Sequence, residues 1–177
     1  MRNLKLLSNR CGVAAVEFAL VTPLLLIIMC GSIEVGNYFR SEHILIKSVR
    51  DGARYAARQR FANFNGCNGT AANVPTTVSD NTKLMVSKGS LNSSDDYLLP
   101  KWTDGSTTFN VTMTCLPAIG TYTPGGIYDN NSVGTANAAP VVIVTAHLPY
   151  QPILQAFGFR GSGYSLNATQ QAAVMGI

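Results

Sequence analysis

The first part of the chain is a hydrophobic run with almost no polar interruption. Residues 13–30 read VAAVEFALVTPLLLIIMC, broken only by Glu17, Thr22 and Pro23. At 1.5 Å per residue, an apolar helix of this length that continues to residue 35 just crosses a bilayer core of about 30 Å. The pattern therefore predicts a membrane-spanning helix over residues 13–35, with a kink or simple tolerance at Pro23.

Two alternatives to a membrane span are a cleaved secretory signal and a buried core helix. The run exceeds a usual signal core, and it is followed by Glu34, Tyr38 and Phe39 rather than by small residues that form a cleavage site. A buried core helix needs a surrounding domain, and no second domain-sized partner is available. The membrane span is therefore the favoured interpretation.

Helical spacing continues past the hydrophobic run to residue 60. Apolar side chains recur on one broad face and basic side chains on the other, as in Phe39, Ile46, Val49, Ala53, Ala56 and Ala57 against Arg40, Lys47, Arg50, Arg54 and Arg58. We expect one continuous helix of roughly 45 to 50 residues, about 70 Å long, whose residues 36–61 form an amphipathic stalk. Gly52 inside this pattern suggests close packing against another element.

The remaining residues, 62–177, predict a small α+β head. Ser79 is the expected cap of a short helix that ends at Lys88. Strands are expected at residues 107–115, 140–148 and 164–174, with a short packing turn or helix over 150–159. The predicted fold class is α+β: a long N-terminal membrane-spanning helix that continues into a stalk and packs against a small antiparallel sheet.

Composition and charge narrow the functional classes. Only 12% of residues are charged and the mean hydropathy is +0.15, which is typical of a membrane or secreted protein. The net charge is +4, and its positive part comes from three bases in residues 1–12 and six bases against two acids in residues 40–60. Glu17 and Glu34 lower it by two, and the four bases and five acids beyond residue 60 lower it by one. The bases do not form a stripe interleaved with aromatic readers, so we expect no nucleic-acid partner.

The orientation of the span rests on the composition of the head. A bare count of Lys and Arg on the two sides favours a cytoplasmic C-terminal side. The chain beyond the stalk is rich in Asn, Thr, Ser and Gly, has few charges and contains two cysteines, which is an extracytoplasmic composition. We therefore predict a single-pass protein of the inner (cytoplasmic) membrane, with a cytoplasmic N-terminus and a periplasmic or extracellular head.

Glu17 is the residue least suited to its surroundings. An ionisable side chain well inside a bilayer costs about 2.5 to 3.5 kcal/mol on insertion scales. One interpretation is that Glu17 reaches back to the membrane interface near Arg10. The other is that Glu17 pairs with a cation that appears only after processing of the chain.

The residues around Glu17 carry a resemblance to a known family. Gly12 is followed by Val13, Ala14, Ala15, Val16 and then Glu17-Phe18, and a short basic segment lies upstream. GVAAVEF before an apolar helix resembles the cleavage site of type IV prepilins. Together with the basic helix ending in VRDGARYAARQ and the C-terminal strands, the chain resembles the TadE-like family of tight-adherence pilus assembly proteins.

The resemblance implies a specific role for each of these residues. A prepilin peptidase would remove the basic leader, residues 1–12, by cutting after Gly12 and leaving Val13 as the new N-terminus. The carboxylate of Glu17, followed by Phe18, would pair with an N-terminal ammonium during subunit assembly. The implied partners are the membrane, other pilin or pseudopilin subunits and the inner-membrane pilus machinery. A minor pilin or pseudopilin fits 177 residues better than a major subunit does.

The remaining reactive residues predict a structural bridge and no chemistry. Cys67 and Cys115 lie outside the leader and the span, and a disulfide between them would stabilise the head by about 4 kcal/mol. Neither His43 nor His147 lies in a Ser-containing elbow motif or at a metal-ligand spacing, so we expect no enzyme, no metal and no cofactor. The alternative function is a single-span membrane-anchored extracytoplasmic binding module.

Overall fold

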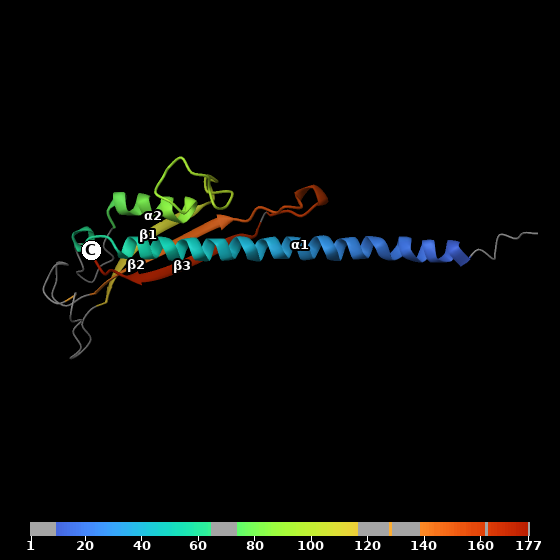
Figure 1. Cartoon of the computed structure of the whole chain (residues 1–177), viewed down its shortest axis with the longest axis horizontal. Coiled ribbons are helices and arrows are strands. Elements are labelled where there is room, and N and C mark those ends of the chain that lie inside the picture. The colour runs from blue at the N-terminus through green and yellow to red at the C-terminus, as the bar shows by residue number, and fades with distance from the viewer. Residues whose placement is uncertain (1–9, 65–73, 117–127, 129–138, 162, 177) are drawn as a thin grey trace, which may run out of the picture.

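The architecture is a long helix with a small head on one end. The computed structural model describes residues 10–64, 74–116, 128, 139–161 and 163–176. A helix and a three-stranded sheet pack against the C-terminal half of the long helix, and the N-terminal half extends away from them (Figure 1). The expected α+β fold is confirmed.

The long helix α1 (Arg10–Ala57) contains 48 residues and continues through Pro23 without interruption. It ends three residues before the predicted residue 60. The backbone N–H of Met175 donates to the carbonyl of Ala57 at 2.9 Å, so the chain after the last strand takes the acceptor at the helix end. A short 3₁₀ helix, η2 (Phe61–Phe64), follows.

The sheet is an antiparallel meander with the strand order β1-β2-β3. The strands are β1 (Thr108–Leu116), β2 (Ala139–Pro149) and β3 (Ser165–Ala173). Each of the three predicted strands is present, with ends that differ by one residue. The central strand β2 is buried along most of its length, because α1 covers the sheet there and β1 and β3 flank it.

The hydrophobic core lies between the sheet, α2 (Thr76–Lys88) and the C-terminal half of α1. Its members from α1 recur at helical spacing, and those from the strands alternate: Leu45, Val49, Ala53, Ala56, Val78, Val86, Met113, Val142, Val144, Ala146, Leu148 and Leu166. Phe39, which the spacing placed on the packing face, is 56% exposed. The basic residues of the stalk are exposed, as predicted.

The start of α2 corrects one prediction. The helix begins at Thr76, three residues before Ser79, so Ser79 lies inside the helix and is not its cap. Pro75 occupies the cap position with φ −52°, and its carbonyl accepts hydrogen bonds from the N–H groups of Val78 and Ser79, each at 3.0 Å. The fixed φ of proline is already suited to helix entry, so the helix starts there without a side-chain cap.

At Gly52, α1 and α2 approach each other closely. The residue is buried, and a Cβ atom placed on it would collide with Cγ2 of Val86 and contact Cγ2 of Thr82 at 3.5 Å. The predicted close packing at Gly52 is therefore confirmed. The cause is the missing side chain rather than a special backbone conformation.

We expect Gly52→Ala to destabilise the head by up to about 2 kcal/mol, because overpacking outweighs the gain of about 1 kcal/mol in helix propensity. The free energy of unfolding in detergent micelles measures the effect. Gly36→Ala is the matched control on the same helix, since no atom lies within 4 Å of a Cβ at that position. Equal stability changes for the two variants would contradict the packing role of Gly52.

Candidate functional site

The first part of α1, up to about residue 25, is not covered by the described residues of the head. The helix contains an 18-residue window with a mean hydropathy of 2.4, and none of that window is buried. Large apolar side chains are widely exposed there, including Val13 at 61%, Phe18 at 68% and Leu20 at 75%. Within the part of the chain that the structure describes, α1 is the one helix long and apolar enough to cross a membrane.

Glu17 lies on this uncovered stretch. Its side chain is exposed, and no hydrogen bond or ion pair to it occurs among the residues that the structure places. Val13 and Glu17 are separated by four residues on a continuous helix, so their side chains lie one above the other on the same face. Among the residues that the structure describes, this carboxylate has no partner, so it is available to a group from elsewhere.

Glu34, at the other end of the apolar run, is in the opposite situation. It is 8% exposed, and three donors from the segment after β2 converge on its carboxylate. Ile153 N–H donates to Oε1 at 3.3 Å, Leu154 N–H donates to Oε2 at 3.0 Å, and the hydroxyl of Tyr150 donates to Oε1. Charge-assisted hydrogen bonds of this kind are the strong ones in proteins.

Tyr150 ties this network to the helix. Its hydroxyl also accepts a hydrogen bond from Nδ2 of Asn37 at 2.8 Å, and its ring stands edge-on to the ring of Tyr38 at 5.1 Å between centroids. Burial raises the pKa of Tyr150 to about 12, and the hydrogen bond to Glu34 acts in the same direction. Tyr150 is therefore a neutral donor over the physiological pH range. The network joins the head to α1 at the point where the head begins.

Residues 12–54 match the TadE-like protein family. The predicted resemblance is thereby confirmed for this part of the chain. The family is associated with tight-adherence pilus assembly, and the match together with the single apolar helix indicates a pilus-associated membrane protein. No significant match was found among curated proteins or among solved structures.

The TadE-like segment contains four of the six predicted site residues. Gly12, Val13, Glu17 and Phe18 lie on consecutive turns of α1 and are all exposed. Their roles in processing and assembly stay predictions. The segment also contains Glu34, which sequence reasoning treated only as a charge near the end of the span.

The other two site residues lie outside the TadE-like segment. Cys115 is disulfide-bonded, and Cys30 is a free cysteine. Cys67 lies outside the described residues, so its pairing with Cys115 stays a prediction. Cys115 is the penultimate residue of β1 and lies opposite Pro140 on β2.

The next residues to consider are His147 and the other side chains that could bind a metal ion. His147 lies in β2 between Thr108 and Asn167, as expected of a half-buried strand residue. Among the described residues, no group of three or more His, Cys, Asp or Glu side chains lies close enough to hold a metal ion.

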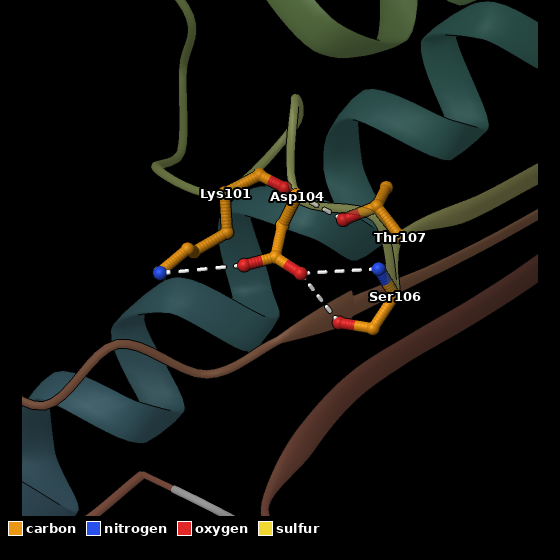
Figure 2. A network of polar contacts seen from close by, with 4 residues as sticks. All are labelled: Lys101, Asp104, Ser106 and Thr107. Atoms are coloured by element: carbon orange, nitrogen blue, oxygen red, sulfur yellow. Dashed lines mark hydrogen bonds and ion pairs between the residues drawn. The ribbon is translucent and has the colours of Figure 1, made fainter.

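A tight polar turn leads into β1 (Figure 2). One carboxylate oxygen of Asp104 accepts hydrogen bonds from the N–H and the hydroxyl of Ser106, at 3.0 and 2.7 Å, and the other pairs with Nζ of Lys101 at 3.3 Å. The bonds from Ser106 lower the pKa of Asp104 to about 2. Thr107 donates to the carbonyl of Lys101 at 2.6 Å and closes the turn. The polar groups of this turn therefore pair with one another, and the turn leads directly into β1.

Proposed function

We propose that this chain is a minor pilin-like or pseudopilin-like subunit that takes part in the assembly of a tight-adherence surface pilus of the type IVb, Flp class. The observation that carries the proposal is the division of α1. Its C-terminal half is the central element of the head core. Its N-terminal half carries apolar side chains that are exposed in the structure. The match of residues 12–54 to the TadE-like family supports the same function.

An exposed apolar helix needs a cover, and two covers suit the same surface. Lipid chains cover it in a membrane, and neighbouring helices cover it in a filament. A subunit that moves from the membrane into an assembly needs this property. Because the helix continues without a break into the head, packing between helices also fixes the position of each head.

The assembly step assigns roles to the N-terminal residues. A prepilin peptidase removes residues 1–12, and Gly12 at the cut lets the backbone approach closely because it has no Cβ atom. Val13 becomes the N-terminus, and its ammonium pairs with the Glu17 carboxylate of a neighbouring subunit. The pairing offsets the desolvation of both charges in an apolar surrounding. The N-terminus lies in the cytoplasm before cleavage, and the head lies in the periplasm or outside the cell.

The competing function is a membrane-anchored binding module in which the helix is only a tether. A tether needs no fixed angle to its head. Here the junction is held by the three hydrogen bonds to buried Glu34 and by the contact of Tyr150 with Tyr38. This rigid junction supports the pilin-like function over the tethered module.

A segment swap tests the choice between the two functions. Residues 13–25 are replaced by an unrelated apolar helical sequence of the same length, which leaves the contacts of the head with α1 from Leu26 onward in place. We expect membrane localisation to remain and surface pili to be lost in a strain that carries only the swapped chain. Electron microscopy of the cells and of sheared surface fractions measures pilus formation.

The unchanged chain expressed from the same vector is the control for the swap. Normal pili with the swapped helix would reject the assembly role of residues 13–25 and favour the tethered module. Cell fractionation checks that the swapped chain is still in the membrane. If it is not, a second replacement sequence with higher hydropathy is used. Pili that form with either sequence count against the proposal.

A further inference from the structure

The segment between β2 and β3, residues 150–164, extends beyond the sheet along α1. In Figure 1 it forms the orange-to-red loop that lies beside α1 and points toward the N-terminal half of the helix. Its base is closed by the hydrogen bond from Tyr150 N–H to the Tyr164 carbonyl at 3.0 Å. Near its tip, Gly158 and Phe159 line a groove of about 530 Å³ together with Leu26, Ile27, Met29 and Cys30 of α1.

The helix residues at the tip of this loop lie inside the predicted membrane span. Cys30 and Leu26 precede residue 35 by five and nine positions, which corresponds to about 7 and 13 Å along the helix axis. A loop that lines a groove with these residues therefore extends past residue 35, the extracytoplasmic end of the predicted span, toward the middle of the bilayer. If residues 13–35 cross the membrane, the tip lies within the outer part of the bilayer.

The chemistry of the loop suits that depth. Ile153 and Tyr164 are 62% and 65% exposed, and Phe159 is half-buried against the helix. Arg160 is exposed, and it is the one charged residue between positions 150 and 164. Aromatic and aliphatic side chains beside a basic residue are typical of segments at the boundary between headgroups and acyl chains.

Several backbone N–H groups of the loop have hydrogen-bond partners. Irregular backbone is tolerated at membrane depth only where its polar groups are satisfied. Glu34 accepts the N–H groups of Ile153 and Leu154, and the N–H of Gly158 donates to the carbonyl of Gln155 at 3.0 Å. The same contacts cover the Glu34 carboxylate, which would otherwise face lipid at the end of the span.

We propose that residues 150–164 insert into the extracytoplasmic leaflet as an interfacial anchor, with a phospholipid bilayer surface as the partner. Phe159 and Ile153 contact the acyl chains near the headgroups, Tyr164 lies at the headgroup level, and Arg160 binds lipid phosphate. The anchor fixes the height and rotation of the head above the membrane before assembly. This proposal rests on the proposed function in one respect, because it requires α1 to span the membrane.

Tryptophan quenching by brominated lipid tests the insertion. The full chain and three variants, Phe159→Trp, Leu20→Trp and Met175→Trp, are reconstituted into phosphatidylcholine and phosphatidylglycerol vesicles with dibrominated acyl chains. The native Trp102 is 6% exposed in the head, and the emission of the unchanged chain is subtracted. Leu20 marks the span, and Met175, 53% exposed and bonded to the end of α1 at Ala57, marks the far end of the head.

We expect the emission at position 159 to be lost with bromines near the headgroups and less so with bromines deep in the chains. Emission at position 20 should be lost most with deep bromines, and emission at position 175 should be unchanged. Circular dichroism confirms that each variant is folded, and Ile153→Trp serves as a second loop probe.

The two proposals fail in different ways. Quenching at position 20 with no quenching at positions 159 and 153 overturns the interfacial anchor and leaves the pilin-like function intact. Absence of quenching at position 20 shows that α1 does not enter the bilayer, which overturns both. Quenching at position 175 equal to that at 159 indicates nonspecific collapse of the head on the vesicle and also overturns the anchor.

Discussion

Glu17→Ala is expected to abolish pilus formation while leaving removal of residues 1–12 intact. The substitution removes a carboxylate whose insertion into the bilayer costs about 2.5 to 3.5 kcal/mol, so the variant enters the membrane more readily than the native chain. A loss of pili therefore cannot result from poor insertion. It follows instead from the loss of the partner for the Val13 ammonium, which then remains an unpaired charge in an apolar surrounding.

The measurements separate processing from assembly. Mobility on a gel and N-terminal mass spectrometry report cleavage, and sheared surface fractions report pili. Thr22→Ala is the matched control, because Thr22 is a polar residue of the same span whose hydroxyl is already satisfied by the carbonyl of Phe18 at 2.7 Å. It should leave both readouts unchanged.

Gly12→Leu provides the complementary variant. It should block shortening of the chain, so the amine that Glu17 requires is never formed, and pili should be lost for the same reason as in Glu17→Ala. Normal pili in Glu17→Ala would reject the pairing. Native protein that retains its first twelve residues would do so as well.

The long helix could be predicted from sequence because its signal is local. The unbroken apolar run and the helical spacing to residue 60 each specify α-helix from neighbouring residues alone, and α1 (Arg10–Ala57) follows. The strands also carry a local signal, the alternation in TFNVTMTC and the apolar run PVVIVTAHL. The ends of the helices could not be predicted as well. Pro75 rather than Ser79 precedes the first residue of α2. The carbonyl of Ala57, at the end of α1, accepts a hydrogen bond from the distant Met175 N–H, which no local pattern indicates.

Glu34 could not be recognised as a site residue in the same way. Its partners Tyr150, Ile153 and Leu154 lie 116 to 120 positions later in the chain, and no motif links the two segments. In the sequence, Glu17 and Glu34 lie near opposite ends of one apolar run. The cost of placing a carboxylate in the membrane is similar for both, so this cost does not distinguish them. The fold distinguishes them, because the head supplies donors to Glu34, whereas its described residues line no groove with α1 before Leu26.

Glu34→Ala is expected to lower the free energy of unfolding of the head by about 1 to 3 kcal/mol, the cost of leaving donors without their acceptor. The N–H groups of Ile153 and Leu154 lose their acceptor, whereas the hydroxyl of Tyr150 keeps the backbone carbonyl of residue 34 at 3.3 Å. Thermal unfolding in detergent micelles, followed by emission of the buried Trp102, measures the stability. Hydrogen exchange at the amides of residues 153 and 154 should become much faster, because these groups lose their acceptor directly.

Two further variants make the result specific to the junction. Asp51→Ala removes an acid from the same helix whose partner Arg54 lies 3.6 Å away on the exposed surface, and such pairs contribute less than about 1 kcal/mol. Glu34→Gln retains one acceptor oxygen and should fall between the native chain and Glu34→Ala. If Glu34→Ala matches Asp51→Ala in stability and leaves exchange at residues 153 and 154 unchanged, then the carboxylate does not hold the loop, and the head is attached to α1 by its hydrophobic core alone.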